Sequence, residues 1–258
     1  MHDTKIYVFD GSFHGLLCAV FQSYERKHKQ IKLVEKNTSA SFLFGEVIDI
    51  ATQRQQAERV LVALQKKISL LHFKHFRDAF FAQNEEAYHH LLGYAIYVFD
   101  NGSGVDCNYG NEHVLALSQI YQKVHREAHR MKAFIRFRQA ADGLFFAVVK
   151  PDFNVLPLIA KHFVSRYSSQ RWVIYDEQRR YGIYYNLNNV EEVTFTFPLS
   201  ESPVAKREHV LLDKDELRYN ILWKDYFRSA NIVERKNIKL HIQHVPKRYW
   251  RYLTEKQV

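Results

Sequence analysis

Three side chains that could act as acid, nucleophile or base lie close together near the start of the chain, in the stretch DGSFHG (10–15). They are Asp10, Ser12 and His14. A strand-like segment precedes the stretch and a helix-like one follows it, and the backbone amides at a helix N-terminus can hold an anion. Alternatively, Asp10 or Ser12 caps the helix and His14 faces solvent. The stretch is neither a P-loop nor a dinucleotide-binding turn, so the three residues are candidate catalytic residues without an assigned reaction.

A second group with chemical potential is KVHREAHRMK (123–132), where His125 and His129 are one helical turn apart. Two such histidines can share a metal, but the H-E-x-x-H pattern is missing and no third ligand is indicated, so no metal site is predicted. Glu127 and His129 form a second candidate acid–base pair. A basic helix face that meets phosphate or water accounts for the cations, and Arg126 and Arg130 are therefore candidate nucleic-acid contacts.

The last residues of the sequence combine cations with large aromatics. From residue 228 to residue 258 there are eight lysines or arginines and two acids, a net charge of +6 out of +9 for the whole chain. Cations neutralise phosphates, and aromatic faces stack on exposed bases. The candidate nucleic-acid-binding residues here are Arg235, Lys236, Lys239, His244, Lys247, Arg248, Tyr249, Trp250 and Arg251. The alternative is that Trp250 and Tyr252 pack into the core and the cations form its solvated rim.

The composition of the 258 residues is that of a folded, basic protein. Hydrophobic residues make up 47% and aromatics 15%, enough for a real core. A pI near 9.4 favours nucleic acid as the partner. No apolar run is long enough to span a membrane and no signal peptide is recognisable, so a cytoplasmic protein with no membrane partner is expected. The two cysteines, Cys18 and Cys107, are too few and too far apart for a zinc ribbon or an iron–sulfur cluster, and no cofactor is expected in this chain.

The first half of the chain is predicted to be mainly helical, with one leading strand. KIYVFD (5–10) alternates like a strand, and apolar residues recur at helical spacing over 13–30 and 46–80. Asn84 is placed to cap a helix that runs to Asp100, where NGSG ends it. Residues 113–134 are predicted to form a further amphipathic helix.

The second half is predicted to form a mostly antiparallel sheet. FIRFRQ and LFFAVVKP flank an ADG turn, a helix over 152–167 accommodates Pro157 in its first turn, and a second hairpin and a strand at 190–198 follow. The order β-β-α-β-β-β, then a helix over 212–230 and the basic tail, indicates an α+β fold. The predicted division is a helical region over 1–130 and an α+β region over 131–258, or alternatively one continuous domain.

Five motifs together resemble a bacterial family assigned to DNA metabolism or DNA repair, whose own activity is not established. They are YVFDGSFHGLLCAVF, HREAHRMKAFIRF, WVIYDEQRRYGIYY, LWKDYFRSANIVERKN and HVPKRYWRYL, and they span essentially the whole chain in order. Residues carried over by the resemblance are Asp10, Gly11, Ser12, Phe13, Gly15, Arg126 to Arg130, Glu234, Arg235, Asn237, Pro246, Arg248, Tyr249 and Trp250. The resemblance implies a radical-SAM partner or fusion to a uracil-DNA-glycosylase-like domain. Since the motifs of both are missing here, a second polypeptide is expected to carry the reaction.

The expected function is therefore that of a DNA repair or DNA metabolism protein that binds nucleic acid through a basic and aromatic C-terminal surface. Two alternatives stay open. One is an enzyme that processes damaged nucleotides, and the other is a module that docks a repair enzyme.

Overall fold

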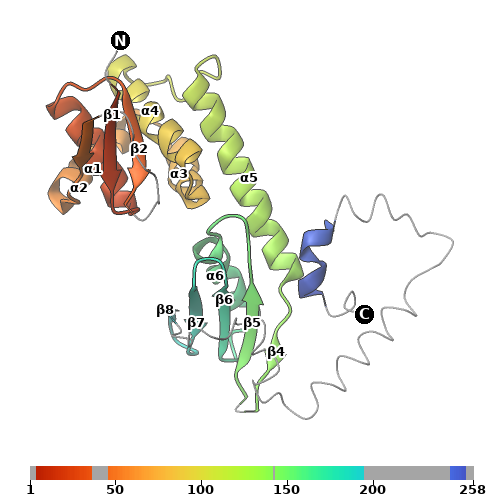
Figure 1. Ribbon diagram of the computed structural model, residues 1–258. Coiled ribbons are helices and arrows are strands. Elements are labelled where there is room, and N and C mark those ends of the chain that lie inside the picture. The colour runs from red at the N-terminus through yellow and green to blue at the C-terminus, as the bar shows by residue number, and fades with distance from the viewer. Residues whose placement is uncertain (1–3, 37–45, 142, 195–244, 254–258) are drawn as a thin grey trace. The chain divides into compact units, whose positions relative to one another are not determined.

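The computed structural model of the protein describes residues 4–36, 46–141, 143–194 and 245–253 (Figure 1). The fold combines helices and strands, as the predicted α+β class requires. The chain divides into two compact units, Met1–Arg126 and Glu127–Val258, and the boundary lies within the long helix α5 (Glu112–Phe134). None of the helices in the described ranges is long and apolar enough to cross a membrane.

The first unit contains a three-stranded parallel sheet rather than a single strand. β1 (Lys5–Phe9) lies between β2 (Ile31–Glu35) and β3 (Glu46–Asp49), and it pairs in parallel with both. The helix α1 (Phe13–Glu25) connects β1 to β2. The prediction of a single leading strand is therefore wrong, since this sheet has three strands. β2 and β3 are short, and their pairing with β1 depends on contacts distant in sequence, so a local pattern does not mark them.

The predicted helix over 13–30 is also too long. α1 ends at Glu25 because Lys27 takes a left-handed backbone conformation, with φ of 57°. The N–H of His28 then donates to the carbonyl of Ser23, and the N–H of Lys27 donates to that of Tyr24, at 3.0 and 3.3 Å. These are the two hydrogen bonds of a Schellman motif, with lysine where glycine is usual. Without a glycine, the sequence carries no stop signal at this point.

The predicted helical region over 46–80 is divided into three elements. Its first residues form β3, and two helices follow, α2 (Arg54–Lys67) and α3 (Leu70–Ala79). They are separate because the side chain of Ser69 accepts a hydrogen bond from the backbone N–H of His72 and so begins a new helix. A short 3₁₀ helix, η1 (Phe80–Ala82), follows α3.

The last two helices of the first half, α5 and the helix before it, agree with the predicted helices over 113–134 and from Asn84 to Asp100. α4 (Glu85–Asn101) begins at its cap Asn84, whose side chain accepts from the N–H of Ala87 at 2.8 Å. It ends at Gly102, which has a positive φ. The buried faces of α1 and α4, with Leu17 and Leu91, pack with β1 and β2 into the core of the first unit.

The second unit contains the predicted β-β-α-β-β-β order. Its elements are β4 (Arg138–Gln139), β5 (Phe145–Val149), α6 (Leu156–Arg166), β6 (Trp172–Asp176), β7 (Tyr181–Tyr185) and β8 (Val190–Val193). The five strands lie in chain order in one sheet. Neighbouring strands are antiparallel except β5 and β6, which are parallel and are joined through α6. Gly143 turns the first hairpin with φ of +80°, and Pro157 lies in the first turn of α6.

The core of the second unit is largely aromatic. Trp172 is fully buried and lies 6.1 Å, ring to ring, from both Phe137 and Phe163. The chain returns to this unit at the 3₁₀ helix η4 (Lys247–Tyr252), whose Tyr249 and Tyr252 are also buried. The predicted helix over 212–230 lies outside the described residues, as do Arg235, Lys236, Lys239 and His244.

Candidate nucleic-acid interface

A pocket of about 430 Å³ lies in the second unit, where the parallel strands β5 and β6 end. Lys150 and Asp152 follow β5 and Gln178 follows β6. The rest of the lining comes from η4 and from Glu127 of α5. In open α/β sheets, ligands bind in the crevice outside the carboxyl ends of the parallel strands, and β5 and β6 are one such parallel pair in an otherwise antiparallel sheet. This pocket therefore occupies a position suited to ligand binding.

Two loops at this edge are held together by Arg179. Its guanidinium contacts the carboxylate of the buried Asp176 at 2.9 Å, and donates to the backbone carbonyls of Pro151 and Asp152 at 3.2 and 3.0 Å. A hydrogen bond from a guanidinium to a buried carboxylate is strong and directional. The loop that carries Lys150 is thus fixed against the end of β6.

The helix η4 is anchored by Glu127. This carboxylate is 2% exposed and accepts from Arg248 Nη2 at 2.7 Å, from the Tyr249 hydroxyl, and from the backbone N–H of Asp152 at 3.3 Å. Burial raises the pKa of the Tyr249 hydroxyl, and the carboxylate of Glu127 raises it further. Glu127 therefore holds Arg248 and Tyr249 in place. Its hydrogen bonds within the described ranges do not include one to His129, which is exposed on α5.

Arg248 and Arg251 border the pocket but are partly engaged. Arg248 pairs with both Glu127 and Asp152 and lies over the ring of Tyr249, 4.6 Å from its centre. Arg251 lies over the ring of Tyr252 and donates to the carbonyl of Lys150 at 3.2 Å. Both guanidinium groups keep an exposed side.

The remaining two cations of the pocket are Lys150 and Lys247. Both residues are exposed, and no ion pair joins either ammonium group to an acid within the described parts of the chain. With Arg248 and Arg251 against Glu127 and Asp152, four positive charges face two negative ones. An anion is the ligand that this balance favours.

The aromatic side chains of the tail differ in how deeply they are buried. Tyr249 is 2% exposed and packs on Phe134, with ring centres 5.1 Å apart, and Arg130 lies 5.7 Å from its ring centre. A ring buried to this degree presents no free face, so Tyr249 cannot stack on a base in this arrangement. Trp250 is half-buried, and its indole N–H donates to the carbonyl of Val245 at 3.0 Å. The alternative that Trp250 and Tyr252 pack into the core is therefore correct for Tyr252, whereas Trp250 is only half-buried. Tyr249, which that alternative did not include, is buried as well.

The candidate residues of the first turn form a helix cap. The hydroxyl oxygen of Ser12 accepts from the N–H of Gly15 at 2.9 Å, and Asp10 accepts from the N–H of Ser12 and the hydroxyl of Thr52 at 2.9 and 2.8 Å. Burial alone would raise the pKa of Asp10, but these hydrogen bonds hold it below its ordinary value. His14 is exposed. The structure places Ser12 in the capping role that the sequence left open, and Asp10 holds the turn in front of it.

The histidines of α5 lie in different surroundings. The Nε2 atom of His125 contacts the buried carboxylate of Asp78 at 2.9 Å, and its ring lies 4.2 Å from that of Tyr121. His129 is exposed, and so is Arg126. Among the described residues, neither of them belongs to a group of three ligating side chains close enough for one metal.

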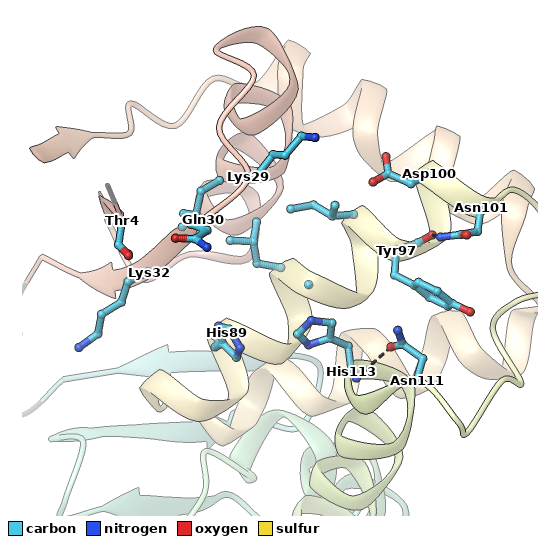
Figure 2. A pocket seen from close by; sticks show the side chains of 14 residues that line it. Thr4, Lys29, Gln30, Lys32, His89, Tyr97, Asp100, Asn101, Asn111 and His113 are labelled. Atoms are coloured by element: carbon cyan, nitrogen blue, oxygen red, sulfur yellow. Dashed lines mark hydrogen bonds between the residues drawn. The ribbon is translucent and has the colours of Figure 1, made fainter. Parts of the chain in front are cut away.

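Groups of metal-ligating side chains that the sequence did not indicate occur in the first unit. One is His89, His90 and His113, and the other is His72, Asp106 and Cys107. His89 and His113 also line a pocket of about 510 Å³ (Figure 2). A spacing rule could not find the first group, because His90 and His113 are 23 residues apart on different helices.

Comparison with known proteins identifies a family but no activity. A family model described as a domain of unknown function, DUF4130, matches residues 82–255, which is more than half of the chain. No curated protein and no solved structure matches it.

Proposed function

The chain belongs to the DUF4130 family, a domain of unknown function, and we propose that it binds nucleic acid through the cationic pocket at the ends of β5 and β6. The single observation that carries the proposal is the convergence of four cations on this pocket. Two of them, Lys150 and Lys247, have no anionic partner in the described parts of the chain. Such ammonium groups can take phosphate without breaking an existing ion pair.

In this proposal the cations of the pocket have different roles. Lys150 and Lys247 contact the phosphate backbone directly. Arg248 mainly anchors η4 through Glu127 and adds its exposed edge to the phosphate contact. Trp250, rather than Tyr249, is the aromatic that can reach a base, because its ring is only half-buried. Arg235, Lys236, Lys239 and His244 lie outside the described residues and stay predictions.

The repair role implied by the resemblance is part of the same proposal. Binding would bring this chain to DNA, and a radical-SAM or uracil-DNA-glycosylase-like partner would carry the reaction. Co-purification with that partner in high salt would indicate a protein contact that does not depend on DNA, since salt weakens exposed electrostatic contacts.

An enzyme that uses Asp10 with His14, or Glu127 with His129, has less support. No hydrogen bond joins the two members of either pair in the described structure, and both carboxylates are engaged in capping or anchoring contacts. The test of the binding proposal is the salt dependence of oligonucleotide affinity after Lys150 and Lys247 are replaced by alanine.

A further inference from the structure

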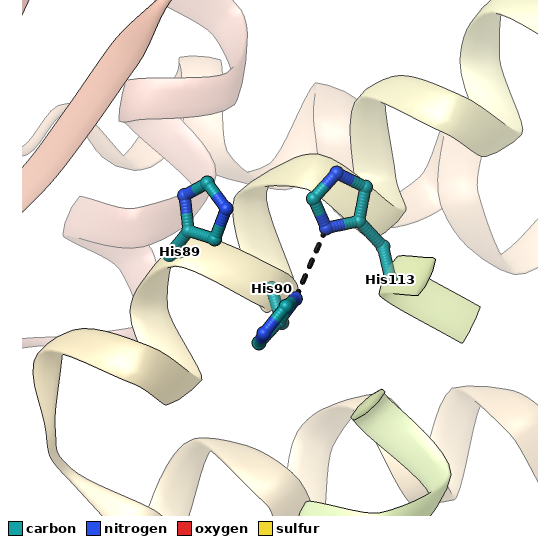
Figure 3. Close-up of side chains that lie close together, drawn as sticks. All are labelled: His89, His90 and His113. Atoms are coloured by element: carbon teal, nitrogen blue, oxygen red, sulfur yellow. Dashed lines mark hydrogen bonds between the residues drawn. The ribbon is translucent and has the colours of Figure 1, made fainter. Parts of the chain in front are cut away.

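Three histidines of the first unit face one another across two helices. His89 and His90 are neighbours in α4, and His113 lies in the first turn of α5 (Figure 3). Their ring centres are 5.1, 5.4 and 5.4 Å apart, which is a nearly equilateral arrangement. One nitrogen of each ring lies within 4.8 Å of one nitrogen of the other two.

The closest pair already has the spacing of two ligands on one ion. Nδ1 of His90 and Nδ1 of His113 are 3.1 Å apart. Two nitrogens that bind a tetrahedral ion at about 2.0–2.1 Å are separated by about 3.3–3.4 Å. The ligand nitrogens of all three rings lie within 4.8 Å of one another, so His89 is the third ring beside this pair.

Gly93 makes room for this arrangement. A Cβ atom at this position would lie 2.4–2.6 Å from three atoms of the His113 ring, closer than any real contact. Glycine in the interior of a helix is less favourable than alanine. α4 thus contains a helix-weakening residue at a point where the imidazole of His113 lies against its backbone.

The surroundings of His113 leave both of its ring nitrogens near polar groups. Its backbone N–H donates to the side chain of Asn111 at 3.0 Å, which fixes the start of α5. Nδ1 faces His90, while Nε2 lies 3.8 Å from a carboxylate oxygen of Glu112, too far for a hydrogen bond. Histidines that bind metals usually direct their other ring nitrogen to a carboxylate or carbonyl, and Glu112 is the acid on that side of the ring.

The pocket beside the histidines gives a ligand access to the ion. His89 and His113 line it together with Lys29, Tyr97 and Asp100 (Figure 2). Three protein ligands leave one position of a tetrahedral ion open, and sites of this kind are catalytic more often than structural. An exogenous ligand can reach that position from the pocket.

We propose that His89, His90 and His113 bind one transition-metal ion of the zinc class, with an open coordination position toward this pocket. Ligand chemistry selects the class, because three imidazoles suit zinc, copper, nickel, cobalt or iron, whereas magnesium and calcium require oxygen ligands. This site is independent of the nucleic-acid interface.

The second group of ligating side chains is a weaker candidate and serves as a control. Nδ1 of His72 already contacts the Ser69 hydroxyl at 2.8 Å and Asp106 at 3.0 Å, and Asp106 also accepts from the N–H of Ser69. The sulfur of Cys107 lies 4.0 Å from the same nitrogen. The polar atoms of this group are thus already hydrogen-bonded to one another at the start of α3.

The test is a metal titration of the full chain after removal of metals with a chelator. Co²⁺ is added first, because its visible absorption reports tetrahedral nitrogen ligation, and Zn²⁺ is then used in competition. The expected result is one ion per chain, with affinity reduced at least about 100-fold in His90→Gln and His113→Gln, since loss of an outer contact alone costs about 10–100-fold. His125→Gln and Cys107→Ser should bind like the wild type.

A further variant separates ligation from folding. Gly93→Ala keeps all three histidines but displaces the ring of His113, so it should weaken Co²⁺ binding while circular dichroism stays that of a folded protein. Wild-type affinity in His90→Gln and His113→Gln would overturn the proposal, as would no binding by the folded wild type or binding that is lost in Cys107→Ser.

Discussion

Arg248 donates to the carboxylate of Glu127 at 2.7 Å, although the two residues are 121 positions apart in the chain. Glu127 is buried, whereas the side chain of Arg248 is 44% exposed. The contact attaches η4 to α5 within the second unit. It also means that a cation of the basic tail has a structural role in addition to any role in binding.

Removal of the buried partner should therefore destabilise the protein. Glu127→Gln leaves the donors of Arg248 and Tyr249 without their charged acceptor, and we expect a loss of about 1–3 kcal/mol in the free energy of unfolding. Asp152→Asn is the matched control, because Asp152 is exposed and its pairing with Arg248 should contribute at most about 1 kcal/mol. Urea unfolding measures both variants, and equal losses would contradict the anchoring role of Glu127.

The end of α1 offers a stabilising substitution. Lys27 is held at φ of 57°, a conformation that costs a residue with a Cβ about 1–2 kcal/mol relative to glycine. Lys27→Gly should raise the free energy of unfolding, by about 0.5–1 kcal/mol after the greater entropy of the unfolded glycine is subtracted. Lys29→Gly, two residues further on and at negative φ, should lower it. If both variants are destabilised, the left-handed cap is not the reason that α1 ends here.

The N-terminal turn predicts a specific dependence on pH. Because hydrogen bonds hold the folded-state pKa of Asp10 below that of the unfolded chain, the ionised carboxylate stabilises the fold above about pH 4–5. This contribution should be lost as the pH falls through the folded-state pKa. The difference in stability between wild type and Asp10→Asn should therefore shrink in acid.

Asn84→Ala is the control for that measurement. It removes the cap of α4, and its loss of about 1 kcal/mol should be present at pH 7 and in acid alike, since the amide does not titrate. Chemical unfolding at pH 7 and near pH 3 compares the two variants. A constant difference for Asp10→Asn across this range would show that its charge is not the stabilising feature.

Features with a local signal were predictable from the sequence. The second sheet was found from alternating strands, Gly143 and Pro157, and α4 from its cap Asn84. β2 and β3 were not found, because short strands acquire their structure from pairing with β1. The end of α1 was misplaced because the residue in the left-handed conformation is a lysine.

The candidate sites were less predictable, since side chains distant in sequence form them. A tail rich in lysine, arginine and tyrosine has the same composition whether its tyrosines face a base or a core. Only the contact with Phe134 shows that Tyr249 is buried. Likewise, Lys150 was not indicated, because its place beside Lys247 depends on how β5 ends.

The central claim is that the cationic pocket contacts phosphate, and the salt dependence of binding tests it most directly. Affinities for labelled single-stranded, duplex and abasic-site oligonucleotides would be measured by fluorescence anisotropy between about 50 and 200 mM salt. The wild type is compared with Lys150→Ala/Lys247→Ala and with Lys66→Ala/Lys161→Ala, which removes the same charge from exposed lysines outside the pocket. The account predicts that the slope of log affinity against log salt falls by about 1.4–1.8 in the pocket variant only, at about 0.7–0.9 per phosphate contact. Equal slopes in the wild type and the pocket variant, or no binding by the wild type, would contradict it.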